Sequence, residues 1–252
     1  MGVHEWPADS PIVPDGLPYC ATCQGMRVVH REAAPHELTG KLVACPACSA
    51  LVTRRRRNAL YRAKRALIDL YSQLQGRALS QTFDTFDLQK VSQSVREAYL
   101  AAATFAQAPR GFLVFSGSVG TGKSHLAAAI ANYQNAQPEA IDRAILFFIT
   151  PSLLELLRGG YARGDYDTLL TLTMDCELLI LDDLGAESQT DWATEKLFVI
   201  VNHRYQMRLP TVVVTNCALV DLEPRMRSRL SENGFSCCMV LAGDDYRLRG
   251  TQ

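Results

Sequence analysis

Residues 111–125 read GFLVFSGSVGTGKSH, and this stretch decides the fold. The apolar run GFLVF has the length of a strand, and Gly117–Ser124 then matches G-x-x-x-x-G-K-[ST] at every fixed position. Glycines at this spacing let successive backbone N–H groups wrap a phosphate. The alanine-rich run that follows indicates a helix, whose positive N-terminus faces the same anion. The sequence therefore predicts a strand, a phosphate-binding loop and a helix in succession.

Each polar group of this loop has an expected task. Lys123 would neutralise the β- and γ-phosphates of a nucleotide, and the Ser124 hydroxyl would coordinate Mg²⁺. The alternative is a glycine-rich turn with a chance lysine, which the flanking strand and helix disfavour. The candidate ATP-binding residues of the loop are Gly117, Ser118, Val119, Gly120, Thr121, Gly122, Lys123, Ser124 and His125.

Further apolar runs of strand length alternate with helical segments downstream of the loop. The predicted strands are AILFFIT (144–150), ELLILDDLG (177–185), TVVVTN (211–216) and SCCMVLAG (236–243). The predicted helices between them are KSHLAAAIANYQ (123–134), PSLLELLRGG (151–160) and DWATEKLFVIVNHRYQM (191–207). Continuous apolar strands separated by helices indicate an α/β fold with a parallel sheet between layers of helices. Ligands bind such sheets beyond the carboxyl ends of the strands.

Two strand ends carry polar residues that fit nucleotide chemistry. Asp182 and Asp183 end a strongly apolar strand, where a carboxylate is costly unless it meets a cation or hydrogen-bond donors. We expect Asp182 to hold Mg²⁺ and Asp183 to orient or deprotonate the attacking water. Thr215 and Asn216 end another strand, and a polar side chain there could bind the γ-phosphate. A solvated turn is the alternative at both places.

Arginines cluster beyond the strand that ends at Asn216. Arg225, Arg227 and Arg229 lie in the segment EPRMRSRLSENG. An arginine presented to a neighbouring subunit's γ-phosphate would stabilise charge in the transition state. A solvated basic helix face is the competing interpretation for each one.

The sequence argues against a membrane-spanning or secreted protein. The 252 residues hold 26 basic and 26 acidic side chains and 48% hydrophobic residues, as in an ordinary globular protein. No apolar stretch reaches the roughly 18–20 residues that span a bilayer, and the N-terminus lacks a secretory signal, so we expect a cytoplasmic protein. Residues 54–65 hold seven basic side chains and no acidic one, which suits DNA phosphates, an acidic protein surface or simply a solvated helix face.

The cysteines predict a small metal-binding module near the N-terminus. Cys20-x-x-Cys23 and Cys45-x-x-Cys48 are separated by 21 residues, close to the spacing of four-cysteine zinc sites. A segment this short has too little core to fold alone, so zinc would supply the stability. Unrelated thiol pairs or a redox pair are the alternatives, and His30 or His36 could replace one cysteine. Small buried residues, not ligands, are expected at Cys176, Cys217, Cys237 and Cys238.

These features divide the chain into four parts. We expect a flexible tail at 1–18, a zinc-binding module at 19–52, a basic linker helix at 53–79 and a P-loop ATPase domain at 80–252. Within the linker, the helical pattern runs to Gln75 and Gly76 stops it. A second helix is expected at 91–107.

With these residues in view, the chain resembles the bacterial and phage helicase-loader ATPases of the AAA+ class, a family that includes DnaC, DnaI and the transposition helper IstB. The resemblance covers roughly residues 80–250. The cysteine-bearing segment also resembles the zinc-ribbon-like module of some loaders. The motifs that carry the resemblance are FDTFD (83–87), GSVGTGKSHLAAAIAN (117–132), LLILDDLGAE (178–187), DWATEKLFVIVNHRY (191–205), VVVTN (212–216), RMRSRL (225–230) and DYR (245–247).

The resemblance implies a slow, switch-like Mg²⁺-dependent ATPase that assembles through ATP-bridged interfaces and places a hexameric replicative helicase on single-stranded DNA. It implies that Lys123 and Ser124 bind phosphate and Mg²⁺, that Asp182 and Asp183 bind Mg²⁺ and activate water, and that Asn216 is a sensor. By the same resemblance Arg229 is the preferred trans-acting finger with Arg225 as the alternative, and Arg247 is a second sensor. AAA+ enzymes usually carry Glu where this chain has Asp183.

Two other functions compete with helicase loading. A transposition helper acting on target DNA with a transposase would have nearly the same core motifs, and the zinc module argues for the loader. A P-loop kinase of a small metabolite is the third, but it gives the arginine cluster and the basic zinc module no task.

Overall fold

The structure, a computed structural model, falls into two compact units, Met1–Ala63 and Lys64–Gln252. It describes residues 28–31, 41–45, 70–89, 91–137, 144–185, 190–243 and 245–246. The predicted tail, the basic run at 54–65 and several predicted site residues lie outside these ranges, namely Cys20, Cys23, His36, Cys48 and Arg247. No described helix is long and apolar enough to cross a lipid bilayer.

The described part of the first unit is a two-stranded hairpin. Strand β1 (Val28–Arg31) pairs antiparallel with β2 (Lys41–Ala44), and Val28 lies opposite Ala44. The chain therefore enters β1 and leaves β2 at the same end of the hairpin. Cys45 follows β2 directly and is fully buried. His30 lies inside β1, opposite Leu42.

The second unit is built on a parallel sheet, as predicted. Its five strands lie in the order β4-β5-β6-β3-β7, and every pairing is parallel. Each predicted apolar run forms one strand. The strands are β3 (Phe112–Gly117), β4 (Ile145–Ile149), β5 (Leu178–Leu184), β6 (Thr211–Thr215) and β7 (Ser236–Leu241).

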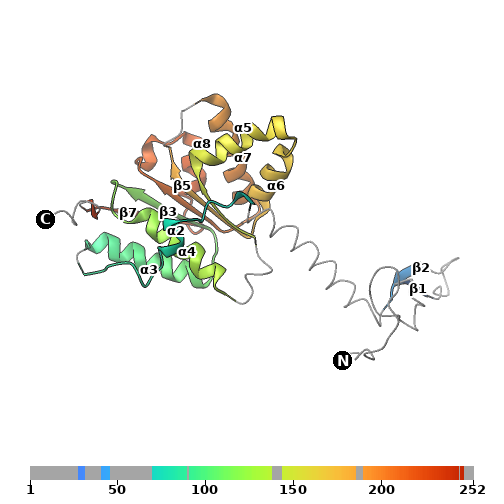
Figure 1. Cartoon of the computed structure of the whole chain (residues 1–252), viewed down its shortest axis with the longest axis horizontal. Coiled ribbons are helices and arrows are strands. Elements are labelled where there is room, and N and C mark those ends of the chain that lie inside the picture. Colours follow the sequence, from blue (N-terminus) through green and yellow to red (C-terminus); the bar gives the residue numbers. More distant parts are fainter. Residues whose placement is uncertain are drawn as a thin grey trace, which may run out of the picture. The chain divides into compact units, whose positions relative to one another are not determined.

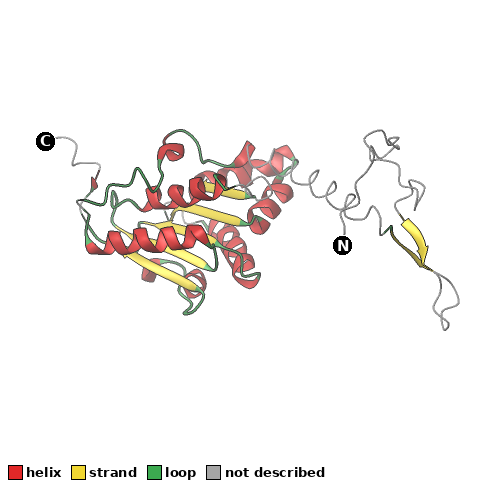
Figure 2. Cartoon of the chain, turned by 90° about the horizontal axis from the view of Figure 1, so that it is seen from below, coloured by secondary structure: helices red, strands yellow, loops and turns green. Residues whose placement is uncertain are grey.

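Helices cover both faces of this sheet (Figures 1 and 2). One face carries α2 (Arg77–Ser80), α3 (Gln93–Gln107) and α4 (Lys123–Asn135). The other carries α5 (Thr150–Arg163), α6 (Tyr166–Asp175), α7 (Asp191–Gln206) and α8 (Pro224–Leu230), with the 3₁₀ turn η2 (Leu219–Asp221) before α8. Helix α6 is not among the predicted helices.

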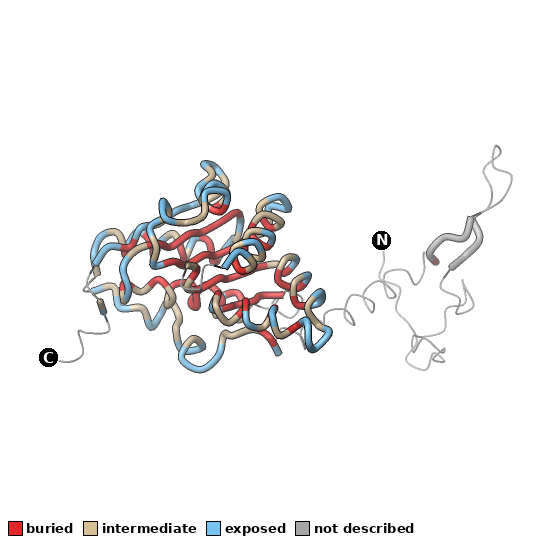
Figure 3. Tube along the Cα trace, turned by 90° about the horizontal axis from the view of Figure 1, so that it is seen from above, coloured by how far each residue is buried: buried red, intermediate tan, exposed pale blue. Residues whose placement is uncertain are grey.

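The strands are continuously apolar because each face feeds a separate core. In β3, Phe112 and Val114 pack with α5 to α8, while Leu113 and Phe115 pack with α3 and α4. Side chains alternate between the two faces of a strand, so both sets must be apolar. Burial is concentrated in the sheet, and the outer surfaces of the helices are exposed (Figure 3).

Two of the four cysteines expected in the core are exposed. Cys176 is buried and Cys217 is half-buried, but Cys237 and Cys238 are exposed. The expectation fails because β7 is an edge strand, and edge strands lack a neighbour on one side.

The linker helix also ends earlier than predicted. Leu70 and Tyr71 are helical, but residues 72–75 are not, and Gly76 lies in a turn. The segment instead runs beside β4: the Gln73 N–H donates to the Phe147 carbonyl (2.7 Å), and the Ile149 N–H donates to the Gln73 Oε1 (2.8 Å). Tyr71 donates its hydroxyl to Asp165 (2.6 Å). Backbone groups of the β4 edge thus override the helical pattern, because an edge left unpaired is costly.

Candidate nucleotide-binding site

The predicted phosphate loop connects the end of β3 to the start of α4. Gly117, Gly120 and Gly122 have φ angles of 130°, 78° and 97°, which side-chain-bearing residues rarely adopt. A Cβ atom on Gly122 would lie 2.8 Å from the Phe86 ring. Glycine is therefore required here both for the backbone conformation and for the close approach of Phe86.

Lys123 lies inside this loop. Only 4% of its surface is exposed, and its Nζ donates to the carbonyls of Gly117 (2.8 Å) and Ser118 (2.6 Å). These bonds hold the ammonium at the centre of the turn, where a bound phosphate would meet it. The position is the one predicted for a group that neutralises phosphate charge.

The two aspartates lie in a bulge of β5. Leu181 pairs with Val213 and Leu184 pairs with Thr215, so Asp182 and Asp183 together oppose a single residue of β6. Asp183 has a φ angle of 63°, a left-handed conformation that Asp tolerates better than most residues. A bulge bends the strand and changes the direction of its side chains, and here the two carboxylates reach different partners.

Asp182 faces the first turn of α4. The Ser124 hydroxyl donates to the Asp182 Oδ1 (2.9 Å). Burial raises the pKa of this carboxyl, and the Ser124 hydrogen bond offsets that effect only in part. A hydroxyl and a buried carboxylate beside a phosphate loop are oxygen ligands of the kind that Mg²⁺ prefers. The residues present thus fit the metal that the sequence predicts.

Asp183 faces the end of β6. The Asn216 Nδ2 donates to the Asp183 Oδ1 (2.7 Å), as expected for two polar residues at the carboxyl ends of neighbouring strands. Thr215 has a structural role instead: it is fully buried, its hydroxyl donates to the Leu184 carbonyl (2.7 Å), and it accepts from the Cys217 N–H (3.0 Å). The strand end therefore offers Asn216, and not Thr215, to a ligand.

A cavity of about 450 Å³ opens on this loop. Its lining includes Gly120 to His125, Asp183 and Asn216, so the structure brings these predicted residues together around one space. The lining also includes apolar residues of the segment before β3, namely Phe86, Val91 and Val95. A cavity lined by both polar and apolar residues suits a nucleotide, which has charged phosphates and an aromatic base.

Sequence patterns assigned no role to two walls of this cavity, the segment around Phe86 and Tyr246, whereas His125 was predicted to bind ATP. His125 accepts from or donates to Thr85 (3.3 Å) and contacts the Thr82 carbonyl (2.9 Å), and its ring centre is 5.0 Å from that of Phe86. Burial lowers the pKa of His125. His125 therefore ties the segment 82–86 to the loop. The motif FDTFD (83–87) was the sequence signal for this wall, but the motif alone does not predict which residues the segment contacts.

The second unassigned part is the end of the described chain. The Tyr246 N–H donates to the Gly120 carbonyl (3.0 Å), and its hydroxyl donates to Asp87 (3.1 Å). Tyr246 thus closes one side of the cavity, next to the predicted sensor Arg247, which lies outside the described residues.

The three clustered arginines are not part of this cavity's lining. Arg225 forms an ion pair with Glu223 (2.8 Å), and Arg227 donates to the Val220 carbonyl (3.1 Å). Arg229 donates to Asn202 (3.1 Å). The structure therefore does not bring them to the phosphate loop of their own chain.

Within the described residues, no group of three or more His, Cys, Asp or Glu side chains could hold a metal ion. Of the four predicted zinc ligands only Cys45 is described. The hairpin pairing nevertheless brings the chain before Val28 and the chain after Ala44 to one end, and these are the directions in which the two cysteine pairs lie in the sequence.

Comparison with protein families and curated relatives supports ATP binding in general. The family model of the IstB-like ATP binding protein matches residues 51–225. The replicative helicase loader DnaC of Escherichia coli strain K12 is 25% identical over 143 residues, or 55% of this chain and 57% of that protein. The replicative helicase loader DnaI of Bacillus subtilis strain 168 is 29% identical over 112 residues, or 44% and 35%. The chain thus matches about half or less of these relatives' lengths.

Solved structures agree on the fold. A crystal structure of the DnaC helicase loader superposes with a TM-score of 0.56 at 27% identity, covering 67% of this chain and 100% of that one. The replication initiator DnaA bound to AMPPCP and single-stranded DNA gives a TM-score of 0.57 at 19% identity, covering 66% and 50%. At that identity the likeness to DnaA concerns the fold alone, which is that of a P-loop AAA+ domain.

Proposed function

Because the chain belongs to the family of IstB-like ATP binding proteins, we propose that it hydrolyses ATP to load a replicative helicase onto single-stranded DNA. The observation that carries the proposal is the arrangement around the phosphate loop. Ser124 donates to Asp182 beside the phosphate loop, and Asn216 donates to Asp183 in the lining of the cavity. One pair suits a metal ion and the other suits an attacking water, so the site has the groups that phosphoryl transfer needs.

Each residue of the candidate site has a separate role in the proposed hydrolysis. The loop N–H groups and Lys123 bind the β- and γ-phosphates, and Ser124 and Asp182 hold Mg²⁺, which supplies positive charge to the phosphate oxygens. Asp183 accepts a proton from the water that attacks the γ-phosphorus, while the bond between that phosphorus and the β-phosphate oxygen breaks and ADP leaves. Asn216 orients Asp183 and the water. Arg247 is a second sensor of the nucleotide.

An arginine of a neighbouring copy of the chain stabilises the negative charge that develops on the γ-phosphate in the transition state. Arg229 is our choice for this trans-acting arginine, with Arg225 as the alternative. Such an arginine contributes about a thousandfold or more in rate. A shorter carboxylate at Asp183 than the Glu common in AAA+ enzymes favours slow hydrolysis that acts as a switch.

The proposed partners, a replicative helicase and single-stranded DNA, are inferred from the curated relatives and from the cysteine pairs and basic run of the N-terminal part. The curated relatives DnaC and DnaI are named replicative helicase loaders. We propose that Cys20, Cys23, Cys45 and Cys48 hold one zinc ion and that this cytoplasmic protein contacts the helicase through the resulting module. The seven basic residues of 54–65 suit the phosphates of single-stranded DNA or an acidic surface of the helicase.

A second function is favoured by one observation. The matching family model carries the description IstB-like, and IstB proteins assist transposition, so a transposase acting on target DNA is the alternative partner.

A pull-down with ATP separates the two functions. Tagged full-length protein is incubated with lysate of its host in the presence of Mg²⁺ and ATP, and bound proteins are identified by mass spectrometry. Recovery of a hexameric replicative helicase supports loading, and loss of that recovery with Lys123→Ala shows that it depends on nucleotide. Recovery of a transposase in place of a helicase overturns the loader in favour of the alternative.

A further inference from the structure

Arg229 lies too far from its own phosphate loop to act there. Its backbone carbonyl accepts from the Ser236 hydroxyl (3.2 Å), and Ser236 is the first residue of β7. Strands β7 and β3 are parallel, and Gly117, where the loop begins, pairs with Leu241 at the other end of β7. Ser236 and Leu241 are therefore about 17 Å apart along the strand. Arg229 can therefore contact a nucleotide bound in a phosphate loop only if that loop belongs to another copy of the chain.

Helix α7 holds the Arg229 side chain in one direction. The Arg229 Nε donates to the Asn202 Oδ1 (3.1 Å), and the guanidinium carbon lies 4.8 Å from the centre of the Tyr205 ring. Asn202 and Tyr205 are three residues apart, so they lie on one face of the helix. Tyr205 is itself fixed, because its hydroxyl donates to the Glu232 carboxylate and its ring packs 5.5 Å from that of Phe235.

Asn202 and Tyr205 contact Arg229 without neutralising its charge and without occupying its two terminal nitrogens. Among the described residues, Arg229 forms no ion pair, and neither terminal nitrogen has a hydrogen-bond partner. Arg225 differs, because its Nε pairs with the carboxylate of Glu223 (2.8 Å), which offsets its charge. Arg225 packs on Phe198 (4.4 Å), one turn earlier on α7. A neutral amide and an aromatic ring can orient a guanidinium without neutralising it, whereas a carboxylate cannot.

We infer that Asn202 and Tyr205 are positioning residues, which hold Arg229 ready for the γ-phosphate of ATP bound by a neighbouring subunit. The inference rests on the proposed ATP hydrolysis and adds to it the device that orients the arginine. Orientation matters because a misplacement of about 1 Å can cost about a hundredfold in rate. The neutral character of residue 202 is central, since a negative charge there would draw the guanidinium back into its own subunit.

Mixed assemblies isolate this role. Acceptor subunits carry Arg229→Ala and an intact phosphate loop, and donor subunits carry Lys123→Ala and an intact arginine. Hydrolysis in the mixture comes from acceptor sites completed by donor arginines. Each further substitution is placed in the donor alone: Asn202→Asp, Tyr205→Leu or, as the matched control on the Arg225 support, Phe198→Leu. Steady-state kcat and KM for ATP are measured in mixtures whose assembly is checked by size-exclusion chromatography.

Asn202→Asp is the sharpest variant, because structural and positioning roles predict opposite results for it. A carboxylate at 202 would pair with Arg229, so the donor should melt at the same temperature as its parent or higher. We nevertheless expect kcat of the mixture to fall about tenfold or more, with KM unchanged because the donor does not bind the ATP. Tyr205→Leu should also lower kcat, and Tyr205→Phe, which keeps the ring, should retain most of the rescue.

Three results would overturn the inference. The first is full rescue by Asn202→Asp donors. The second is loss of rescue with Phe198→Leu donors while Asn202→Asp donors remain active, which would transfer the role to Arg225. The third is no rescue by donors carrying only Lys123→Ala, although mixtures assemble. In that case no arginine is shared between subunits, and ATP titrations of the acceptor alone tell whether the proposed nucleotide site itself still stands.

Discussion

At the scale of single residues, the buried carboxyl of Asp182 has opposite effects on folding stability and on the expected metal binding. It is 8% exposed, and burial raises the pKa of its carboxyl, with the neighbouring charge of Asp183 acting in the same direction. Because the folded state favours the protonated form, ionised Asp182 destabilises the nucleotide-free protein at pH values above its pKa. A bound cation would relieve this cost, so the carboxylate contributes to metal binding and opposes stability in the empty site.

Asp182→Asn should therefore stabilise the nucleotide-free protein at neutral pH and weaken Mg²⁺-dependent ATP binding. Asn keeps an oxygen that accepts from Ser124 and removes the buried charge. We expect a melting temperature higher by roughly 2–4 °C for each kcal/mol relieved, measured by calorimetry. The gain should shrink as the pH falls through the raised pKa of Asp182 and vanish well below about 4, where the wild-type carboxyl is protonated in both states. A gain that is independent of pH would contradict this explanation.

Lys123→Ala and Asp183→Asn should separate binding from chemistry. Loss of the Lys123 ammonium removes the charge that meets the phosphates, so ATP binding should be abolished. Asp183→Asn keeps the shape of the side chain, and Asn tolerates the positive φ at this position. We expect it to retain binding and to lower hydrolysis about 10²–10⁴-fold, because only the proton acceptor is lost. Equal loss of binding in titrations of both variants would show that Asp183 has another role.

The geometry of the candidate phosphate loop could be predicted residue by residue for a physical reason. The positions of Gly122, Lys123 and Ser124 follow from local spacing, because a turn between a strand and a helix fixes all three. The bulge that directs Asp182 and Asp183 to different partners leaves no such pattern, since it depends on pairing with β6. The Phe86 and Tyr246 walls of the cavity likewise arise from contacts between segments distant in sequence.

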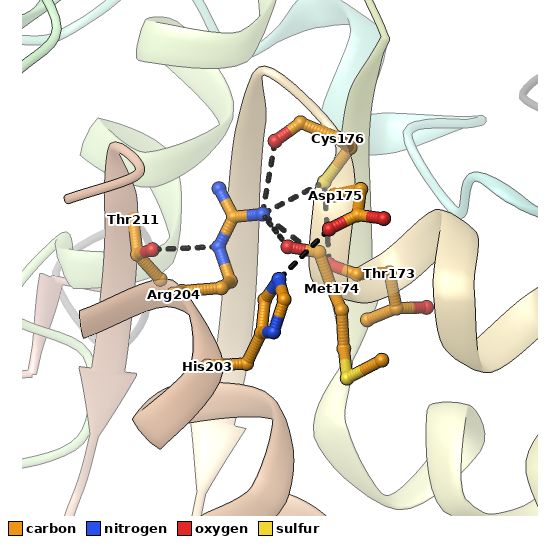
Figure 4. Close-up of polar contacts among 7 residues, drawn as sticks. All are labelled: Thr173, Met174, Asp175, Cys176, His203, Arg204 and Thr211. Carbon is orange, nitrogen blue, oxygen red and sulfur yellow. Dashed lines mark hydrogen bonds and ion pairs between the residues drawn. The ribbon is translucent and has the colours of Figure 1, made fainter. Parts of the chain in front are cut away.

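At the scale of elements, Arg204 joins helix α7 to α6 and to the starts of two strands (Figure 4). It is fully buried, and its guanidinium donates to the carbonyls of Met174 (2.8 Å), Cys176 (2.9 Å) and Pro210 (2.6 Å) and to the Thr211 hydroxyl (2.8 Å). The carbonyls at the end of α6 carry partial negative charge that suits a cation. Sequence gives no sign of this role, because one arginine in an amphipathic helix usually faces water.

Arg204→Met should destabilise the second unit strongly. Methionine fills part of the space but leaves the carbonyls of Met174, Cys176 and Pro210 without their donor, and each buried acceptor so left costs about 1–3 kcal/mol. We expect a total loss of about 3–5 kcal/mol, measured by urea unfolding. His203→Ala is the matched control, since the neighbouring His203 bonds only to the half-exposed Asp175 (2.8 Å) and should cost much less. Similar losses for both would contradict the bridging role.

At the scale of the whole molecule, the chain consists of two units, and we expect their stabilities to have different sources. The second unit has two apolar clusters, one on each face of the sheet, and needs no metal for its core. The segment 72–75 belongs with it, because Gln73 bonds to the edge of β4. Helical periodicity could not anticipate this, since the edge that captures the segment is formed by residues some 75 positions away. The zinc-binding module predicted at 19–52, within the first unit, lies below the size, about 40 residues, at which domains fold without a metal or disulfides.

Zinc removal should therefore act on one unit and spare the other. We expect about one zinc per chain by elemental analysis, because four thiolates at this spacing complete a tetrahedral site. Chelation, or Cys45→Ser, should abolish zinc binding and recovery of the helicase, while the ATP affinity stays unchanged because the second unit keeps its own core. Cys217→Ser is the matched control: this half-buried thiol lies in the ATPase unit, so its loss should leave the zinc content intact. Protein expressed in zinc-replete medium that contains almost no zinc would contradict the site. Loss of ATP binding on chelation, with the zinc site present, would instead show that the two units depend on each other for folding.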